Sequence, residues 1–314
     1  MHAAGALPLP QVPRDHAAGT RGLGLLSRRP ENVGGPSWRH LTLAVVALLG
    51  GGCASATHFE IVDEAKRVGM DVAGHTPFSI RSSEASAAGQ RSVEHMGGVA
   101  LECSDAAERL FAIGHSEDAL EREILDTFSE QRAAELGRTF RVNDTWMVPT
   151  LCLWLPWMAH DVGELERMPG FDQVPAYERD EWAQMRAYLA HERTEQEESL
   201  TRRRFARELA PIAILRGQGV RFLAGTDVGN EYILPGYSLH DELELFVQAG
   251  FTPVAALRTA TSDAADYMHA SDEIGQVAPG MFADLVLLDA NPLADIRNTR
   301  RVSAVILNGR VVEP

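Results

Sequence analysis

Apolar and polar positions change their spacing repeatedly between residues 57 and 227, and each spacing predicts a different element. Residues 57–70 place apolar side chains at helical spacing, with acidic residues early and basic residues late, as a helix dipole favours. Four segments between the helical stretches are expected to be strands, at residues 71–75, 91–95, 145–157 and 220–227. Strands that alternate with crossovers in this way predict a parallel sheet.

The segments between these strands are expected to be helical. Residues 82–89 suit a short helix or turn, whereas residues 104–136 and the charged residues 177–215 suit longer helices. The run at residues 145–157 is almost wholly apolar at its centre, as expected of a strand that is covered on both faces. The pattern therefore favours the α/β class.

The first 56 residues follow a different pattern. Residues 1–38 are rich in Gly, Pro, Ala and Arg without periodicity, which is typical of an unstructured leader. An apolar run of about a dozen residues follows, too short for a membrane span of about 20 residues but suited to a secretory signal. Cys53 resembles the lipidated cysteine of bacterial lipoproteins, although Gly50 stands where that motif prefers leucine. We expect an exported protein, periplasmic or anchored by lipid, with a buried helix as the alternative; a start site placed too far upstream would make it cytoplasmic.

Composition narrows the class of partner. The chain has 314 residues, enough for one large or two modest domains, and its 45% hydrophobic content suffices for a core. A formal net charge of -15 argues against a surface that follows phosphates, so we expect small-molecule or peptide-like partners and no nucleic acid. The three cysteines form no C-x-x-C pair and no disulfide framework.

Three polar residues stand at the carboxyl ends of predicted strands: His75, His95 and Asp227. In (β/α) barrels these ends converge on one mouth, where imidazole and carboxylate groups suit a divalent metal such as zinc. A single histidine is more often a hydrogen-bonded structural residue, but three such residues at successive strand ends favour a site. Glu94, beside His95, could orient a ligand or be a solvated charge.

The C-terminal part carries motifs that resemble a known family. Thr252 and Pro253 suit a helix start, and the Asn-Gly pair at 308–309 suits a hairpin turn. Together with GTDVG at 225–229 and ADLVLLD at 283–289, these residues resemble the C-terminal half of the amidohydrolase superfamily, in its imidazolonepropionase and Xaa-Pro dipeptidase-like branch. The likeness covers roughly residues 57–314.

The resemblance implies a partial (β/α) TIM-type barrel, about its second half, followed by C-terminal strands of a small β-sandwich domain. The corresponding divisions are a leader at 1–56, a partial barrel at 57–270 and the last strands at 271–314. It also implies that His75 and His95 bind metal, and that Asp227 binds metal and accepts a proton from the attacking water. The metal is expected to be zinc, with manganese, iron or cobalt as alternatives. His240 is either a substrate contact or a helix cap.

Parts of the family pattern are missing. No H-x-H pair occurs, the only lysine, Lys66, lies in the predicted helix 57–70, and four strands are found where such a barrel has eight. The sequence thus resembles an export signal joined to the second half of an amidohydrolase. One hypothesis is metal-dependent hydrolysis of amide, cyclic amide or peptide-like C–N bonds. The other is a non-catalytic remnant, binding module or truncated gene product. A half-barrel exposes sheet edges, so a second copy or a complementing chain is expected.

Overall fold

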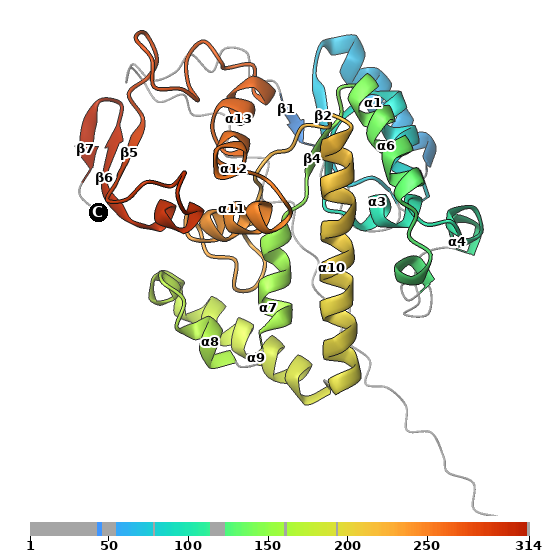
Figure 1. Cartoon of the computed structure of the whole chain (residues 1–314), viewed down its shortest axis with the longest axis horizontal. Helices are drawn as coiled ribbons and strands as arrows, with labels where there is room; N and C mark the ends of the chain where they lie inside the picture. Colours follow the sequence, from blue (N-terminus) through green and yellow to red (C-terminus); the bar gives the residue numbers. More distant parts are fainter. Residues whose placement is uncertain are drawn as a thin grey trace, which may run out of the picture. The chain divides into compact units, whose positions relative to one another are not determined.

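A computed structural model describes residues 43–45, 55–77, 79–113, 123–159, 162–192 and 194–312, all within the compact unit Ser37–Pro314. Its parallel sheet has the order β1-β2-β3-β4 (Figure 1). The strands are β1 (Leu43–Val45), β2 (Asp71–Gly74), β3 (Gln90–Glu94) and β4 (Trp146–Val148). The predicted parallel pairing of the second to fourth of these is confirmed.

The predicted strand at 220–227 lies next to β4 and pairs with it at a single position. Phe222 forms a parallel bridge to Met147, and the Leu223 N–H donates to the Met147 carbonyl oxygen at 2.9 Å. The prediction for residues 145–157 was wrong after Val148. Pro149 lacks the N–H that a ladder needs, and the chain continues as η1 (Leu151–Leu153) and α7 (Trp154–Met158).

Helices fill the crossovers much as the polar pattern predicts. The predicted helix at 57–70 is α1 (Ser55–Val68), and the charged region at 177–215 is two helices, α9 (Ala176–Glu192) and α10 (Glu195–Gly217). The other helical elements are α2 (Ser82–Ala88), α3 (Gly97–Glu102), α4 (Ala107–Ile113), α6 (Glu130–Val142), α8 (Val162–Glu166), η2 (Phe171–Gln173), α11 (Ser238–Gln248), α12 (Pro253–Thr259), α13 (Ser262–Tyr267) and η3 (Ile296–Arg300). None of the helices in the described part of the chain is long and apolar enough to cross a membrane.

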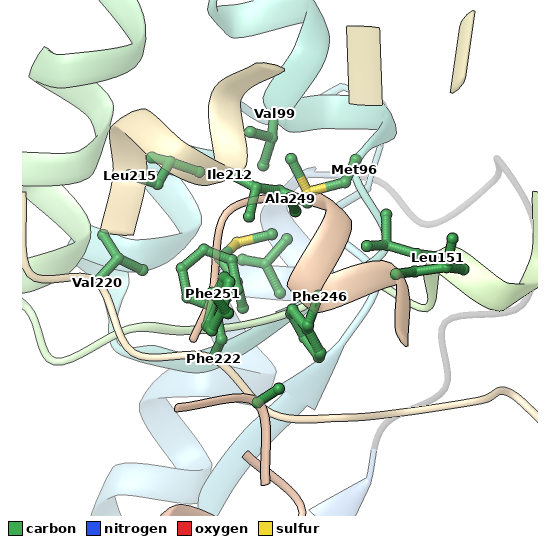
Figure 2. Close-up of a cluster of buried hydrophobic side chains, with 14 of the residues drawn as sticks. Met96, Val99, Leu151, Ile212, Leu215, Val220, Phe222, Phe246, Ala249 and Phe251 are labelled. Carbon is green, nitrogen blue, oxygen red and sulfur yellow. The ribbon is translucent and has the colours of Figure 1, made fainter. Parts of the chain in front are cut away.

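The largest core cluster packs the sheet against α6, α10 and α11. Phe222, Phe246 and Phe251 meet at its centre, with ring centroids 4.8–6.2 Å apart (Figure 2). Each fully buried side chain of this size stabilises the fold by roughly 1.5–3 kcal/mol. Because Phe222 lies beside β4, this packing holds the chain that leads to Asp227.

The C-terminal segment forms an antiparallel sheet of β5 (Leu285–Leu288), β6 (Val302–Leu307) and β7 (Arg310–Val312). The predicted hairpin is confirmed, since Asn308 and Gly309 turn it with φ of 49° and 75°. Thr252 caps α12 as predicted, accepting the Ala255 N–H at 3.3 Å. Within the described ranges, the parallel strands do not close into a barrel and no second sheet faces β5–β7.

The predicted leader lies mostly outside the described residues, and so does Cys53. Only Leu43–Val45 of its apolar run are described, as β1 paired with β2. The export signal and the lipid anchor therefore stay predictions.

Candidate active site

The three residues predicted from strand ends lie at one edge of the parallel sheet. His75 follows β2, His95 follows β3, and Asp227 follows the extended segment beside β4. His95 and Asp227 have left-handed backbone, with φ of 62° and 52°. That conformation costs non-glycine residues of order 1–3 kcal/mol, so surrounding contacts must enforce it.

Their side chains share one cavity of about 420 Å³. The His75 and His95 rings meet edge to face with centroids 4.6 Å apart. His95 Nε2 lies 3.7 Å from Asp227 Oδ2, and the two side chains are 27% and 45% exposed. The structure therefore brings together the three residues that the sequence singles out, within reach of solvent.

Thr150 orients His95, a role that the sequence analysis did not identify. Its hydroxyl contacts His95 Nδ1 and donates to the Pro149 carbonyl oxygen at 2.8 Å. With the hydroxyl proton assigned to the Pro149 carbonyl oxygen, the hydroxyl is left to accept a proton from Nδ1, and in that tautomer the Nε2 lone pair faces Asp227. Burial, and next the neighbouring His75, lower the pKa of His95, so the neutral ring is favoured.

Glu94 is a half-buried member of the same cavity. Burial raises its pKa to about 7, and the negative charge of Asp227 acts in the same direction, while the Ser92 hydroxyl donates to it at 2.8 Å and opposes the shift. Tyr267 in turn donates to Ser92 at 2.9 Å. Glu94 was expected either to orient a ligand or to be a solvated charge. Its partial burial in this cavity excludes a fully solvated charge.

Glu242 of α11 supports the chain behind the cavity, and the sequence did not single it out. It is fully buried, and its Oε2 accepts the Cys152 N–H at 2.8 Å. Its Oε1 has no hydrogen-bond partner among the described residues, and burial raises the pKa of this carboxyl to about 8. It ties η1, which follows Thr150, to α11.

His240 is not brought to this cavity. It lies in the first turn of α11, where its Nδ1 and the Thr299 hydroxyl are 3.0 Å apart. Burial, and next the Arg300 charge, lower its pKa.

The donor types at the cavity fit a divalent metal, but their arrangement is incomplete. Two imidazoles and a carboxylate are the ligand set that zinc and similar metals take. Over the described ranges, no group of three or more His, Cys, Asp or Glu side chains has the arrangement of a metal site. His75, His95 and Asp227 thus share a cavity without forming a closed cage.

Comparison with known proteins gives sequence matches to part of the chain. The model of the amidohydrolase family matches residues 178–312. Adenine deaminase 2 from Jannaschia sp. (strain CCS1) is 40% identical over 55 residues, which are 18% of this chain and 9% of that protein.

Solved structures resemble a larger part of the chain. A bottromycin amidohydrolase is 25% identical with a TM-score of 0.54, covering 81% of this chain and 53% of that one. A putative prolidase from Bifidobacterium longum is 23% identical with a TM-score of 0.52, covering 87% and 56%. Ochratoxinase from A. niger is 19% identical with a TM-score of 0.51, covering 82% and 45%. The chain thus spans about half the length of these proteins.

Proposed function

Because residues 178–312 match the amidohydrolase family, as the sequence motifs predicted, we propose that the chain hydrolyses C–N bonds with a bound divalent metal. Its substrates are amides, cyclic amides or peptide-like molecules. The names of similar proteins, a deaminase, a prolidase and an amidohydrolase, support chemistry at C–N bonds.

The observation that carries the metal proposal is the pair His95 and Asp227. Their facing atoms, 3.7 Å apart, are an oxygen of the Asp227 carboxyl and His95 Nε2, which carries no proton in the tautomer assigned from the Thr150 contact. Two acceptors at this distance repel each other unless a proton or a cation lies between them. Thr150 favours the tautomer with its proton on Nδ1, so a metal cation between Nε2 and Oδ2 would satisfy both atoms.

In this proposal His75, His95 and Asp227 hold the metal, which is zinc, or manganese, iron or cobalt. When bound, such a metal lowers the pKa of water to near neutrality. The Asp227 carboxylate takes a proton from the attacking water and delivers it to the leaving nitrogen. Glu94, which accepts a hydrogen bond from Ser92, lines the same cavity as Asp227 and adds a second carboxyl to it.

Metal content of the purified full chain tests the site. After incubation with zinc and dialysis, we expect about one equivalent by mass spectrometry, as for a mononuclear hydrolase site. The double variant His75→Ala and His95→Ala should lose it. The matched control is His269→Asn, which changes an exposed histidine outside the cavity and suits that residue's left-handed backbone. Equal metal in wild type and double variant would refute the site.

Hydrolysis is tested separately by amine release from a panel of dipeptides, N-acyl amino acids and cyclic amides. Asp227→Asn should lower the rate by about 10²–10⁴-fold, the usual contribution of a general base, while the circular dichroism spectrum stays unchanged. Full activity in Asp227→Asn would contradict the assigned role.

A non-catalytic remnant or binding module is the alternative, and none of the comparisons favours it. Lipid anchoring at Cys53, export and a complementing chain stay proposals that rest on the sequence.

A further inference from the structure

A second cavity of about 420 Å³ adjoins the candidate active site and shares His95 and Thr150 with it. One wall comes from η1 and α7, the other from α10, two helices that lie side by side (Figure 1). The two cavities therefore meet at His95 and Thr150.

The α7 wall is aromatic. Trp154 and Trp157 are three residues apart, so both face the same side of the helix, and Leu153 and Met96 extend the apolar lining. Phe205 of α10 packs behind Trp154, with ring centroids 6.3 Å apart. Such a wall binds apolar stems, and its ring faces attract cations.

The α10 wall is polar and ends in a carboxyl. Thr201, Arg204 and Glu208 follow at intervals of three and four residues and so occupy one helix face. Arg204 has a partner of its own. Glu208 is half-buried, and within the described part of the chain no hydrogen bond or ion pair satisfies its carboxyl.

We propose that this cavity binds a cationic group of the substrate, a primary amine or guanidinium on an apolar stem, with Glu208 as its counter-ion and the two tryptophans as its walls. The inference rests on the proposed function, because it places the scissile amide at His95 and Asp227. It narrows the substrate class to amides or peptides with a basic side chain.

The charge of Glu208 agrees with this assignment. Burial raises its pKa to about 8, and Arg204, one helical turn earlier, has a partner of its own. A buried charge is costly until it is paired, and a bound cation provides the pair. A neutral stem would leave the carboxyl unsatisfied.

Calorimetric titration of the full chain tests the inference without requiring catalysis. The probes are 2-phenylethylamine, the neutral 2-phenylethanol and the anionic 3-phenylpropionate, at pH 8. We expect the amine to bind about tenfold more tightly than the alcohol, the difference that one charge-assisted hydrogen bond supplies. Binding of the anion should be weakest.

Two variants on α10 assign the effect. Glu208→Gln should reduce the preference for the amine to less than about threefold, because the neutral amide keeps the size but not the charge. Glu195→Gln makes the same change at an exposed position of α10 outside the cavity and should keep the wild-type preference. Each outcome that differs overturns the inference: no binding of any probe, equal binding of amine and alcohol, tighter binding of the anion, or a preference that survives in Glu208→Gln.

These results are separable from those for the proposed function. A chain that binds metal and hydrolyses neutral amides, yet shows no amine preference, would refute the cation cavity alone. A chain with the amine preference but no metal and no hydrolysis would refute the proposed function and keep the cavity.

Discussion

Gly225 lies two residues before Asp227, and adding a single methyl group there tests how the site is held. A Cβ at this position would stand 2.4 Å from Val148 Cγ1. Carbon atoms pack at about 3.5–4.0 Å, so roughly 1 Å of movement is needed. Val148 is buried in β4 and its β-branched side chain is restricted at χ1, so it has little freedom to turn away. The movement must come from the chain that leads to Asp227.

We expect Gly225→Ala to lower the free energy of unfolding by about 1–3 kcal/mol, the usual cost of overpacking. Val148→Ala removes the obstructing atom and costs about 1–3 kcal/mol by itself as a core truncation. In the double variant the two costs should not add, and the coupling should rescue at least about 1 kcal/mol. Urea unfolding followed by circular dichroism measures all four free energies.

Gly217→Ala is the matched control. Gly217 ends α10, and a Cβ there has no atom within 4 Å. Its substitution should be neutral or stabilise by about 0.4–1 kcal/mol. The reasoning fails if the free energy of unfolding of Gly225→Ala lies within about 0.5 kcal/mol of the wild-type value, a change typical of surface sites. It also fails if the loss of unfolding free energy in the double variant equals the sum of the losses in the two single variants.

Two further predictions concern Thr150 and the buried acids. Thr150→Val keeps the shape but removes the hydroxyl that contacts His95, so zinc affinity, measured against a chromogenic chelator, should fall about 10–100-fold; an unchanged affinity would contradict the orienting role. Burial raises the pKa of Glu94 to about 7 and of Glu208 and Glu242 to about 8, so the folded protein holds protons that the unfolded chain loses above its ordinary value of 4.5. The stability from these groups is present below pH 4.5 and is lost as the pH rises to 8. Glu242→Gln should flatten the fall in unfolding free energy by up to about 1.4 kcal/mol per pH unit, and equal slopes would refute this.

Elements with a clear period could be predicted from the sequence, and so could the residues at their ends. His75 and His95 were found because each stands at the end of a short predicted strand, and the structure ends β2 and β3 just before them. The run at residues 145–157 was misassigned because a continuous apolar stretch fits a strand or a buried helix equally well. Pro149 was the signal that could have corrected it, since a proline cannot continue a central ladder.

Thr150 and Glu208 could not be found in this way, because their roles depend on contacts distant in sequence. Thr150 meets His95 across 55 positions, through a turn whose left-handed φ of 49° no local pattern announces. Glu208 lies in a charged helical stretch where a carboxylate is ordinarily a solvated surface group. Only the packing of α7 beside α10 turns that helix face toward an aromatic wall.

The pairing register explains why the position of Asp227 depends on the preceding chain segment more than the positions of the histidines do. Val93 pairs with Met147, and Met147 bridges to Phe222, so these positions share one level of the sheet. His95 lies two residues beyond that level, and its N–H still donates to the Val148 carbonyl oxygen of β4. Asp227 lies five residues beyond that level. The intervening chain is fixed by the Ala224 N–H donating to the Thr259 carbonyl oxygen at 3.2 Å and by the close approach of Gly225 to Val148. If the chain around Gly225 moves away from Val148, the Asp227 carboxylate moves relative to His95, while the two histidines stay in place. Gly225→Ala should therefore lose zinc even under conditions in which the variant remains folded.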